Sequence, residues 1–354
     1  MKGSEFWWIM QSYKRHQGKD YPSLTFYVDK IAQKRWMPTI GYDVPKSFAL
    51  RYKTELEKGE IKPFATVKGE VGRGGEKYDI EDIKRLMPIN KSFVAKASHF
   101  SSARSVTIVE CCKRGSDGSL KARKNDGFGY NRLDEVFSLH RQDYRLQIAG
   151  QLLTDLNELD ATDEDAQLRL TQGLLIEQRF LSGGDTADDA LPALEFKCFV
   201  IWSRLFACHY RRGNFDPGYY GRSGKLIYKK PGGASVSSLP DYVVWEKVVH
   251  IAERRAAHMD QLRVDIYVGR GSNDEKSDPI RYVISEVEME QTSKFDPALM
   301  DEATRLWIAG YQMNIFKVVP NTEVPKVYLE NGLRLPANYT EICSKDRRHD
   351  LCKT

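Results

Sequence analysis

The chain has 354 residues, of which 41% are hydrophobic and 29% charged, and its formal net charge is +5. This length and composition allow a sizeable core, in one large domain or two to three closely joined subdomains. The sequence contains no run of roughly eighteen apolar residues, which argues against a membrane-spanning helix. Its basic residues are not gathered into a stripe interleaved with aromatics, which argues against a dedicated nucleic-acid binder.

Six cysteines are sparse for this length, and none forms a C-x-x-C pair. The spacing disfavours a zinc site or a disulfide framework and favours a reducing compartment, so we expect a cytoplasmic protein. The first residues, Met1-Lys-Gly-Ser-Glu-Phe6, partly resemble a cloning scar. A natural targeting segment would then have been removed without trace.

Helices and strands are predicted to alternate along the whole chain. Residues 1–90 are expected to be mixed and mostly helical, with an amphipathic helix at 27–36 and a short helix at 81–86. Further helices are predicted at 133–159, 242–259 and 297–316. Strands are predicted at 92–96, 106–111, 174–177, 195–201, 205–210, 261–268 and 282–289. Residues 114–131 and 214–238 are rich in turn-forming residues and are predicted to be loops, the first of them a loop or hairpin.

Many of these strands are separated by turns rather than by helices, which favours an α+β fold with largely antiparallel sheets. We expect an N-terminal mixed region at 1–90 and a C-terminal extension at 321–354. Between them we expect two α+β subdomains, at 91–176 and 177–320.

Two late strands carry a concentration of charged side chains. Arg263 and Asp265 are two residues apart, as are Glu286 and Glu288, so each pair shares one face of its strand. Neighbouring strands would bring Asp265, Glu286 and Glu288 together, and three close carboxylates repel unless a cation lies between them. Oxygen ligands suit Mg²⁺, and Arg263 could stabilise a phosphoryl group in transit. A hairpin with one solvated face explains the same spacing, and this alternative stays open.

Two earlier positions fit a nucleotide site. Lys96 ends an apolar strand and precedes a small-residue loop at 97–105, whose N–H and hydroxyl groups can wrap phosphate oxygens. Glu177 ends another apolar strand and enters a linker of the kind that recognises adenine, and Glu195 further on can bind ribose hydroxyls. On local grounds, ordinary strand exits explain both patterns, and this alternative stays open.

The order of these features resembles the ATP-grasp superfamily. Asp29-Lys30, Lys96-Ala-Ser-His-Phe-Ser-Ser102, Glu177-Gln-Arg-Phe-Leu-Ser182, Arg263-Val-Asp265 and Glu286-Val-Glu288 resemble successive motifs of D-alanine–D-alanine ligases. Phe93-Val-Ala-Lys96, Glu195-Phe-Lys197-Cys-Phe199 and Arg263-Val-Asp265-Ile-Tyr267 are most similar to the TupA-like group, named for teichuronopeptide biosynthesis. Three features depart from the pattern: the 97–105 loop has no glycine, Glu288 stands where the family has Asn, and residues 289–293 differ from the continuation usual in the TupA-like group.

The resemblance implies an ATP-grasp fold, in which two antiparallel sheets sandwich ATP with two Mg²⁺ ions. The implied residues are Lys30, Lys96, Lys197, Ser101 and Ser102 for phosphates; Glu177, Gln178 and Phe180 for adenine; Glu195 for ribose; Asp265, Glu286 and Glu288 for the metal; and Arg263 and Lys96 for catalysis.

The implied reaction joins a small-molecule carboxylate to an amine through an acyl phosphate. Residues 214–238, carrying Tyr219, Tyr220 and Arg222, are the candidate lid. Three alternatives remain: an ATP-grasp-fold kinase acting on a hydroxyl group, a non-catalytic binding module, and a glycosyltransferase-like enzyme.

Overall fold

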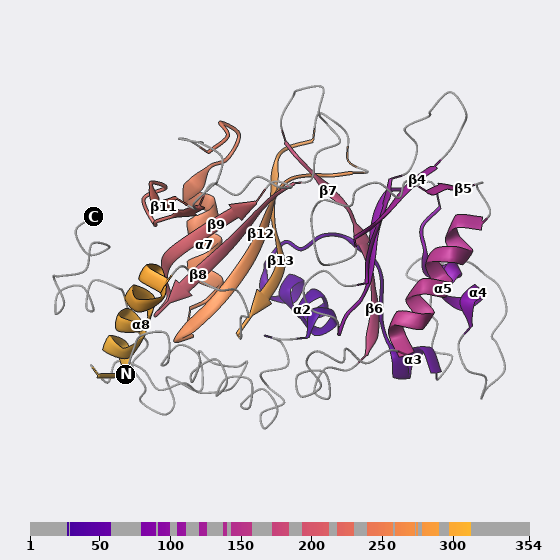
Figure 1. Cartoon of the computed structure of the whole chain (residues 1–354), viewed down its shortest axis with the longest axis horizontal. Coiled ribbons are helices and arrows are strands. Elements are labelled where there is room, and N and C mark those ends of the chain that lie inside the picture. Colours follow the sequence, from indigo (N-terminus) through magenta and orange to yellow (C-terminus); the bar gives the residue numbers. More distant parts are fainter. Residues whose placement is uncertain are drawn as a thin grey trace. The chain divides into compact units, whose positions relative to one another are not determined.

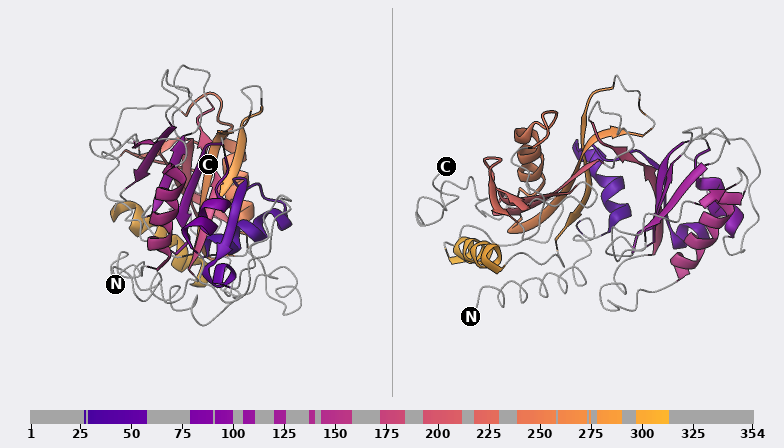
Figure 2. Two further views of the ribbon diagram at one scale, coloured as in Figure 1. Left: turned by 90° about the vertical axis from the view of Figure 1, so that its right-hand side faces the viewer. Right: turned by 45° about the horizontal axis from the view of Figure 1, so that its top comes forward.

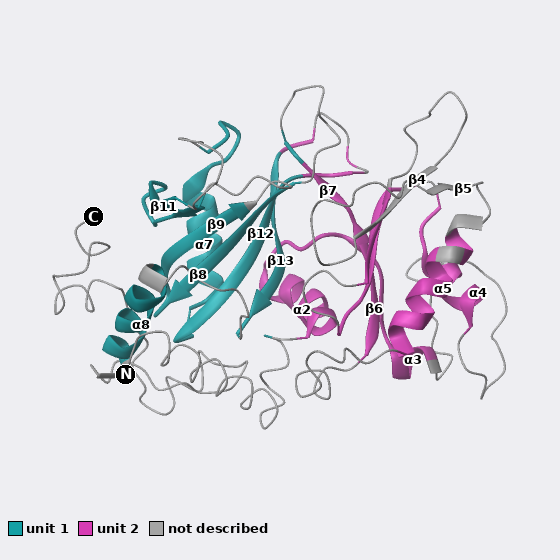
Figure 3. Ribbon diagram, in the orientation of Figure 1, with its two compact units in different colours: residues 1–28, 182–269, 280–354 teal, residues 29–181, 270–279 magenta. Residues whose placement is uncertain are grey.

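The computed structural model describes residues 27, 29–57, 79–89, 91–99, 105–110, 120–125, 137–139, 143–157, 172–183, 193–211, 218–229, 239–257, 259–272, 274, 278–289 and 297–312. The chain forms two compact units (Figure 3). Unit 1 comprises residues 1–28, 182–269 and 280–354, and unit 2 comprises residues 29–181 and 270–279. All strand pairings among the described residues are antiparallel, which confirms the predicted α+β class with largely antiparallel sheets.

Unit 2 is built on a six-stranded sheet in the order β1-β6-β2-β3-β4-β5 (Figure 1). Its strands are β1 (Ser47–Tyr52), β2 (Phe93–Ala97), β3 (Val106–Glu110), β4 (Leu120–Asn125), β5 (Phe137–Leu139) and β6 (Gly173–Gln178). Every residue of β6 is buried, because neighbouring strands and helices cover both of its edges and both of its faces. This explains why its sequence is a continuous apolar run rather than an alternating one.

Helices cover both faces of this sheet (Figure 2). Helices α4 (Ile80–Leu86) and α5 (Asp143–Asn157) lie on one face, over a core that includes Ile83, Leu152, Phe93 and Ile176. Helix α2 (Lys30–Trp36) lies on the other face, where Ile31 packs with Leu50 and Leu175. A short helix, α3 (Lys53–Glu57), follows β1 directly.

Side-chain caps fix where two of these helices begin. The carboxylate of Asp29 accepts the Ala32 N–H at 2.8 Å, so α2 starts at Lys30, three residues after the predicted start. Asp79 and Asp82 form a reciprocal capping box at the start of α4. These caps satisfy N–H groups that the first turn of a helix leaves without an intrahelical acceptor.

Unit 1 is built on a sheet in the order β11-β10-β9-β8-β12-β13. Its strands are β8 (Leu194–Ile201), β9 (Arg204–Arg211), β10 (Gly218–Tyr220), β11 (Leu226–Lys229), β12 (Gln261–Gly271) and β13 (Arg281–Glu288). The last two residues of β12, Arg270 and Gly271, belong to unit 2, where they pair with β7 (Phe180–Leu181).

Two helices in the described part of unit 1 pack against its sheet or its strand turns. Helix α7 (Trp245–Arg255) contacts β8 and β9, and the Trp245 ring meets Phe196 and Tyr220 at centroid distances of 6.0 and 6.3 Å. Trp202 packs against helix α8 (Pro297–Gln312), where its indole N–H donates to the carbonyl oxygens of Leu306 and Trp307.

The β8–β9 turn places Trp202 and Ser203 in the left-handed region, with φ of 52° and 63°. Neither residue is a glycine, so the turn is strained and depends on tertiary packing. Trp202 is fully buried against Gly310 of α8, where a side chain larger than hydrogen would overlap the indole.

Two sequence predictions are wrong. The predicted helix at 133–159 contains β5 at Phe137–Leu139, because these residues pair with β4, and α5 begins only at Asp143. The predicted loop at 214–238 contains the β10–β11 hairpin, in which Tyr219 and Tyr220 are buried. The described part of the candidate lid is therefore a paired strand structure.

The compact units also differ from the expected subdomain boundaries. Residues 29–57, expected in an N-terminal region, belong to unit 2 because β1 pairs with β6 along its length. The chain enters unit 1 at Ser182, five residues after the expected division. Neither difference was visible locally, because strand pairing joins segments that are far apart in the sequence.

Candidate functional site

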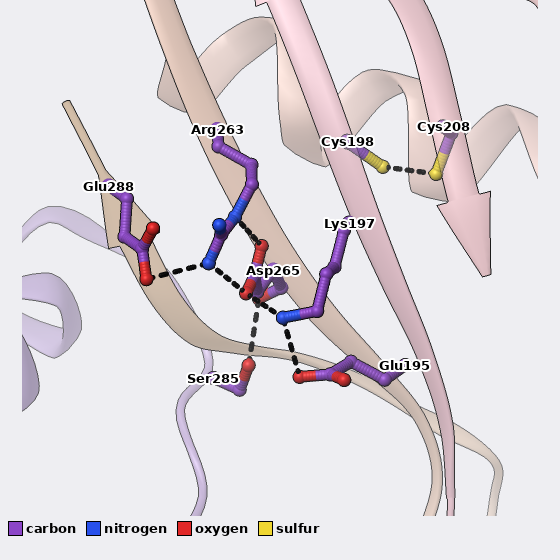
Figure 4. Close-up of polar contacts among 8 residues, drawn as sticks. All are labelled: Glu195, Lys197, Cys198, Cys208, Arg263, Asp265, Ser285 and Glu288. Carbon is purple, nitrogen blue, oxygen red and sulfur yellow. Dashed lines mark hydrogen bonds and ion pairs between the residues drawn. The ribbon is translucent and has the colours of Figure 1, made fainter. Parts of the chain in front are cut away.

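Of the charged side chains predicted on the late strands, Arg263, Asp265 and Glu288 lie together in the unit 1 sheet (Figure 4). Strand β12 lies between β8 and β13, and its Asp265 is opposite Lys197 on one side and Glu286 on the other. Its Arg263 is opposite Glu288. We call Glu195, Lys197, Arg263, Asp265 and Glu288 the Arg263 cluster.

Asp265 is the centre of this cluster. Its side chain is 1% exposed, and its Oδ1 accepts from Arg263 Nε at 2.8 Å. Its Oδ2 accepts from both Arg263 Nη2 and Lys197 Nζ, each at 2.8 Å. Burial alone would raise the pKa of Asp265, but the two cations outweigh burial and lower the pKa below its usual value. Asp265 is therefore a carboxylate held ionised.

The two cations are correspondingly stabilised in their charged forms. Burial by itself lowers the pKa of Lys197 and of Arg263, but Asp265 and the glutamates more than offset this effect, so both pKa values are raised. Lys197 also contacts Glu195 Oε1 at 3.3 Å. The cluster thus holds two permanent positive charges against carboxylates on three adjoining strands.

Glu288 differs from Asp265 in its ionisation. Its Oε1 lies 2.7 Å from Arg263 Nη2, and its side chain, at 27%, is the most exposed of the cluster. Shielding of the carboxylate from water raises its pKa to about 7; Arg263 opposes this effect, while Glu286 and Asp265 add to it. Desolvation is therefore the main reason for the raised pKa of Glu288, and the nearby Arg263 offsets it only in part.

Asp265 and Glu288 of this cluster, with Glu286 on the same strand as Glu288, carry only oxygen donors, the kind that Mg²⁺ prefers. Both oxygens of Asp265 already accept from Arg263 and Lys197. Within the described ranges, no three acidic, histidine or cysteine side chains are arranged so that they alone could hold a metal ion. The magnesium assignment of Asp265, Glu286 and Glu288 therefore stays a prediction.

A second buried charge cluster lies in unit 2. Glu177, on β6, is 4% exposed in its side chain, and its two oxygens are used separately. Oε1 accepts from Lys96 Nζ of β2 at 3.2 Å, and Oε2 lies 3.1 Å from Lys34 Nζ of α2. Burial would raise the pKa of Glu177, but the two lysines lower it below its usual value. We call these three residues the Glu177 cluster.

Sequence reasoning did not single out Lys34. It chose Lys30, which is half-buried in the first turn of the same helix. Lys34 is one turn further along and therefore shares a face with Lys30 and Ile31. That spacing, with Ile31 fully buried, is the signal that could have found it.

The other predicted residues stand as follows. Glu195 is directed onto Lys197, as described above. The Gln178 amide donates to Asp274 Oδ1 at 2.8 Å and its backbone N–H donates to Lys46 O, while Phe180 is buried beside Gly271. Ser101 and Ser102 lie outside the described residues. The adenine, ribose and phosphate assignments remain predictions.

No protein-family model and no curated protein matches this sequence. Among solved structures, it is similar to the D-cycloserine synthetase DcsG, with 9% identity and a TM-score of 0.38 over 81% of this chain and 72% of that one. It is also similar to the ATP-grasp ligase PsnB complexed with a phosphomimetic variant of its minimal precursor, Mg and ADP, with 11% identity and a TM-score of 0.31.

That second match covers 81% of this chain, which spans only 60% of the PsnB chain. A PsnB complex with precursor peptide PsnA2 and AMPPNP matches with 12% identity and a TM-score of 0.31, over 81% of this chain and 61% of that one. Such distant likenesses carry no argument about function, which rests here on the chain's own residues. None of the helices in the described part of the chain has the length and apolar character needed to cross a bilayer.

Proposed function

We propose that this chain is an ATP-dependent ligase of the ATP-grasp kind, which joins a carboxylate to an amine using Mg-ATP. The observation that carries the proposal is the Arg263 cluster. An arginine and a lysine converge on one buried carboxylate, beside a glutamate at the more exposed side of the same sheet face. The motifs that resemble ATP-grasp enzymes supply these side chains, and a solvated hairpin face does not require the buried contacts that they make.

In this proposal the chain's residues act by positioning and by neutralising charge. Arg263 and Lys197, fixed by Asp265, would hold the oxygens of the phosphoryl group in transit. Asp265, Glu286 and Glu288 would hold magnesium, which when bound neutralises charge on the phosphates. The remaining assignments follow the sequence resemblance: Lys30, Lys96, Ser101 and Ser102 on phosphates, the segment from Glu177 to Phe180 at adenine, and Glu195 at ribose.

The proposed reaction has two steps. An oxygen of the substrate carboxylate attacks the γ-phosphorus, the bond from that phosphorus to the bridging oxygen breaks, and ADP leaves. The nitrogen of the amine then attacks the carbonyl carbon of the acyl phosphate, inorganic phosphate leaves, and the amine loses a proton. Arg263 would stabilise the negative charge that builds on the phosphoryl oxygens in the first step. The substrates are proposed to be small molecules.

Calorimetric titration with AMPPNP, with and without Mg²⁺, tests the nucleotide site. We expect Mg²⁺ to tighten binding to the wild type, and expect Glu286→Gln and Glu288→Gln to lose this tightening because each removes an anionic ligand. Glu81→Gln is the matched control, because Glu81 lies at the exposed start of α4 and pairs only with Lys84 among the contacts described. Equal, metal-independent binding by all four proteins would contradict the proposal.

Product analysis separates a ligase from a kinase. We expect inorganic phosphate to appear with Mg-ATP only when a carboxylate and an amine are both supplied, and not when either is supplied alone. A phosphorylated hydroxyl compound in place of free phosphate would identify a kinase. Absence of nucleotide binding would identify a non-catalytic module.

A further inference from the structure

The shared carboxylate of Glu177 links Lys96 to helix α2. Because each oxygen serves a different lysine, the position of the Lys96 ammonium depends on the orientation of the Glu177 carboxylate, which Lys34 fixes from the other side. The three residues come from three elements: α2, β2 and β6. Val94 and Ser47 flank Glu177 on the adjoining strands, so its backbone is held within the sheet.

Of the two lysines that contact Glu177, Lys34 is the more buried. The side chain of Lys34 is 2% exposed, whereas that of Lys96 is 16% exposed. Helix α2 is pinned at its start by Asp29, which accepts from the Tyr52 hydroxyl at 3.2 Å as well as capping the helix. It is pinned again next to Lys34, where Arg35 forms a bidentate pair with Glu55.

Pairing of buried opposite charges makes Lys34 and Glu177 depend on one another. A buried carboxylate and a buried ammonium are each costly unless they are paired, so Lys34 and Glu177 hold one another in a single geometry. The more exposed ammonium of Lys96 is thus anchored on a carboxylate whose other oxygen lies 3.1 Å from Lys34 Nζ. Preorganisation of this kind lowers the entropy lost when a ligand binds.

We propose that Lys34 is a positioning residue that acts through Glu177 to hold Lys96 ready for an anionic phosphate oxygen of the nucleotide. This inference rests on the proposed function. It adds a residue that the sequence resemblance does not include, and it gives the Glu177 side chain a role apart from adenine contact. Lys34 itself does not touch the nucleotide; its effect passes entirely through Lys96.

The test compares the affinities of AMPPNP and adenosine by calorimetry, because only AMPPNP carries phosphates. Lys34→Met should lower the ratio of the two affinities by about tenfold, the size of one lost charge-assisted hydrogen bond. Lys96→Met should lower it at least as much. The double variant should match Lys96→Met alone, because a residue that acts through another adds nothing once that other is gone.

Lys84→Met is the matched control, since Lys84 lies on α4 and pairs with Glu81 at the surface. If Lys34→Met fails to fold because Glu177 is left with one lysine, Lys34→Met combined with Glu177→Gln removes both charges and should show the same lowered ratio. An unchanged ratio in the folded variant, or a double variant in which the two losses multiply, would overturn the inference. A wild type that does not bind AMPPNP would instead overturn the proposed function, and this inference with it.

Discussion

Replacing Asp265 by Asn tests whether the Arg263 cluster is the electrostatic centre that its geometry indicates. The substitution keeps the shape of the side chain but removes its charge and turns one oxygen into a donor. Three charge-assisted contacts at 2.8 Å then lose their ionised acceptor, at a site that is 1% exposed. Two buried cations are left facing an amide.

Removing one partner of a buried ion pair typically costs about 3–5 kcal/mol, within a total stability of about 5–15 kcal/mol. We expect the lower end of that range, because Arg263 keeps Glu288 at 2.7 Å and Lys197 keeps Glu195 at 3.3 Å. Glu195→Gln is the internal control: its side chain is 22% exposed and makes one long contact, so the loss should stay within about 1 kcal/mol.

Urea unfolding followed by tryptophan fluorescence measures both variants, because Trp202, Trp245 and Trp307 all lie in unit 1. Transitions with unchanged slopes can be compared directly. If Asp265→Asn lost no more stability than Glu195→Gln, the burial and pairing of Asp265 would contribute nothing, and the electrostatic reasoning would be refuted.

Three further outcomes are expected. Gly310→Ala should destabilise unit 1 by about 1–3 kcal/mol in the same unfolding assay, because the new methyl group overlaps the buried indole of Trp202. Gly150→Ala in α5 should instead stabilise its helix, because the nearest atom to the new methyl group is 4.0 Å away. Asp29→Asn should keep the α2 cap, because Asn also caps helices. Burial raises the pKa of Asp29 in the folded state, so the wild-type protein loses folding stability as pH rises through that pKa and the carboxyl ionises. The variant should therefore become more stable relative to wild type between acid and neutral pH, and a relative loss of stability would contradict this. The thiols of Cys198 and Cys208, which are fully buried and 2.8 Å apart, should resist iodoacetamide in the native protein and react in guanidinium, as measured by mass spectrometry. Burial also raises the pKa of the Cys208 thiol, which leaves less reactive thiolate. Labelling of the native protein would show that this face of the sheet opens.

Local patterns were sufficient where a side chain's direction depends only on its own strand. Arg263 and Asp265 share a face because side chains alternate along β12, and the same rule places Glu286 and Glu288 together on β13. Antiparallel pairing of these two strands, predicted from their closeness in sequence, brings the two pairs opposite one another.

Long-range pairing was beyond the reach of the sequence. That Lys197 meets Asp265 depends on the register of β8 against β12, and that Lys34 reaches Glu177 depends on how α2 packs over β6. The pairing of β5 with β4 likewise overrode a helical pattern.

The sequence by itself determined the secondary-structure class, the apolar strands and the charged pairs that each late strand presents. Only the tertiary structure decided which cation faces which carboxylate, because a buried charge selects its partner through distances set by the whole sheet. Local spacing in the sequence therefore predicted several residues of the two charge clusters. The distances and partners of these residues depend on how the strands and helices pack.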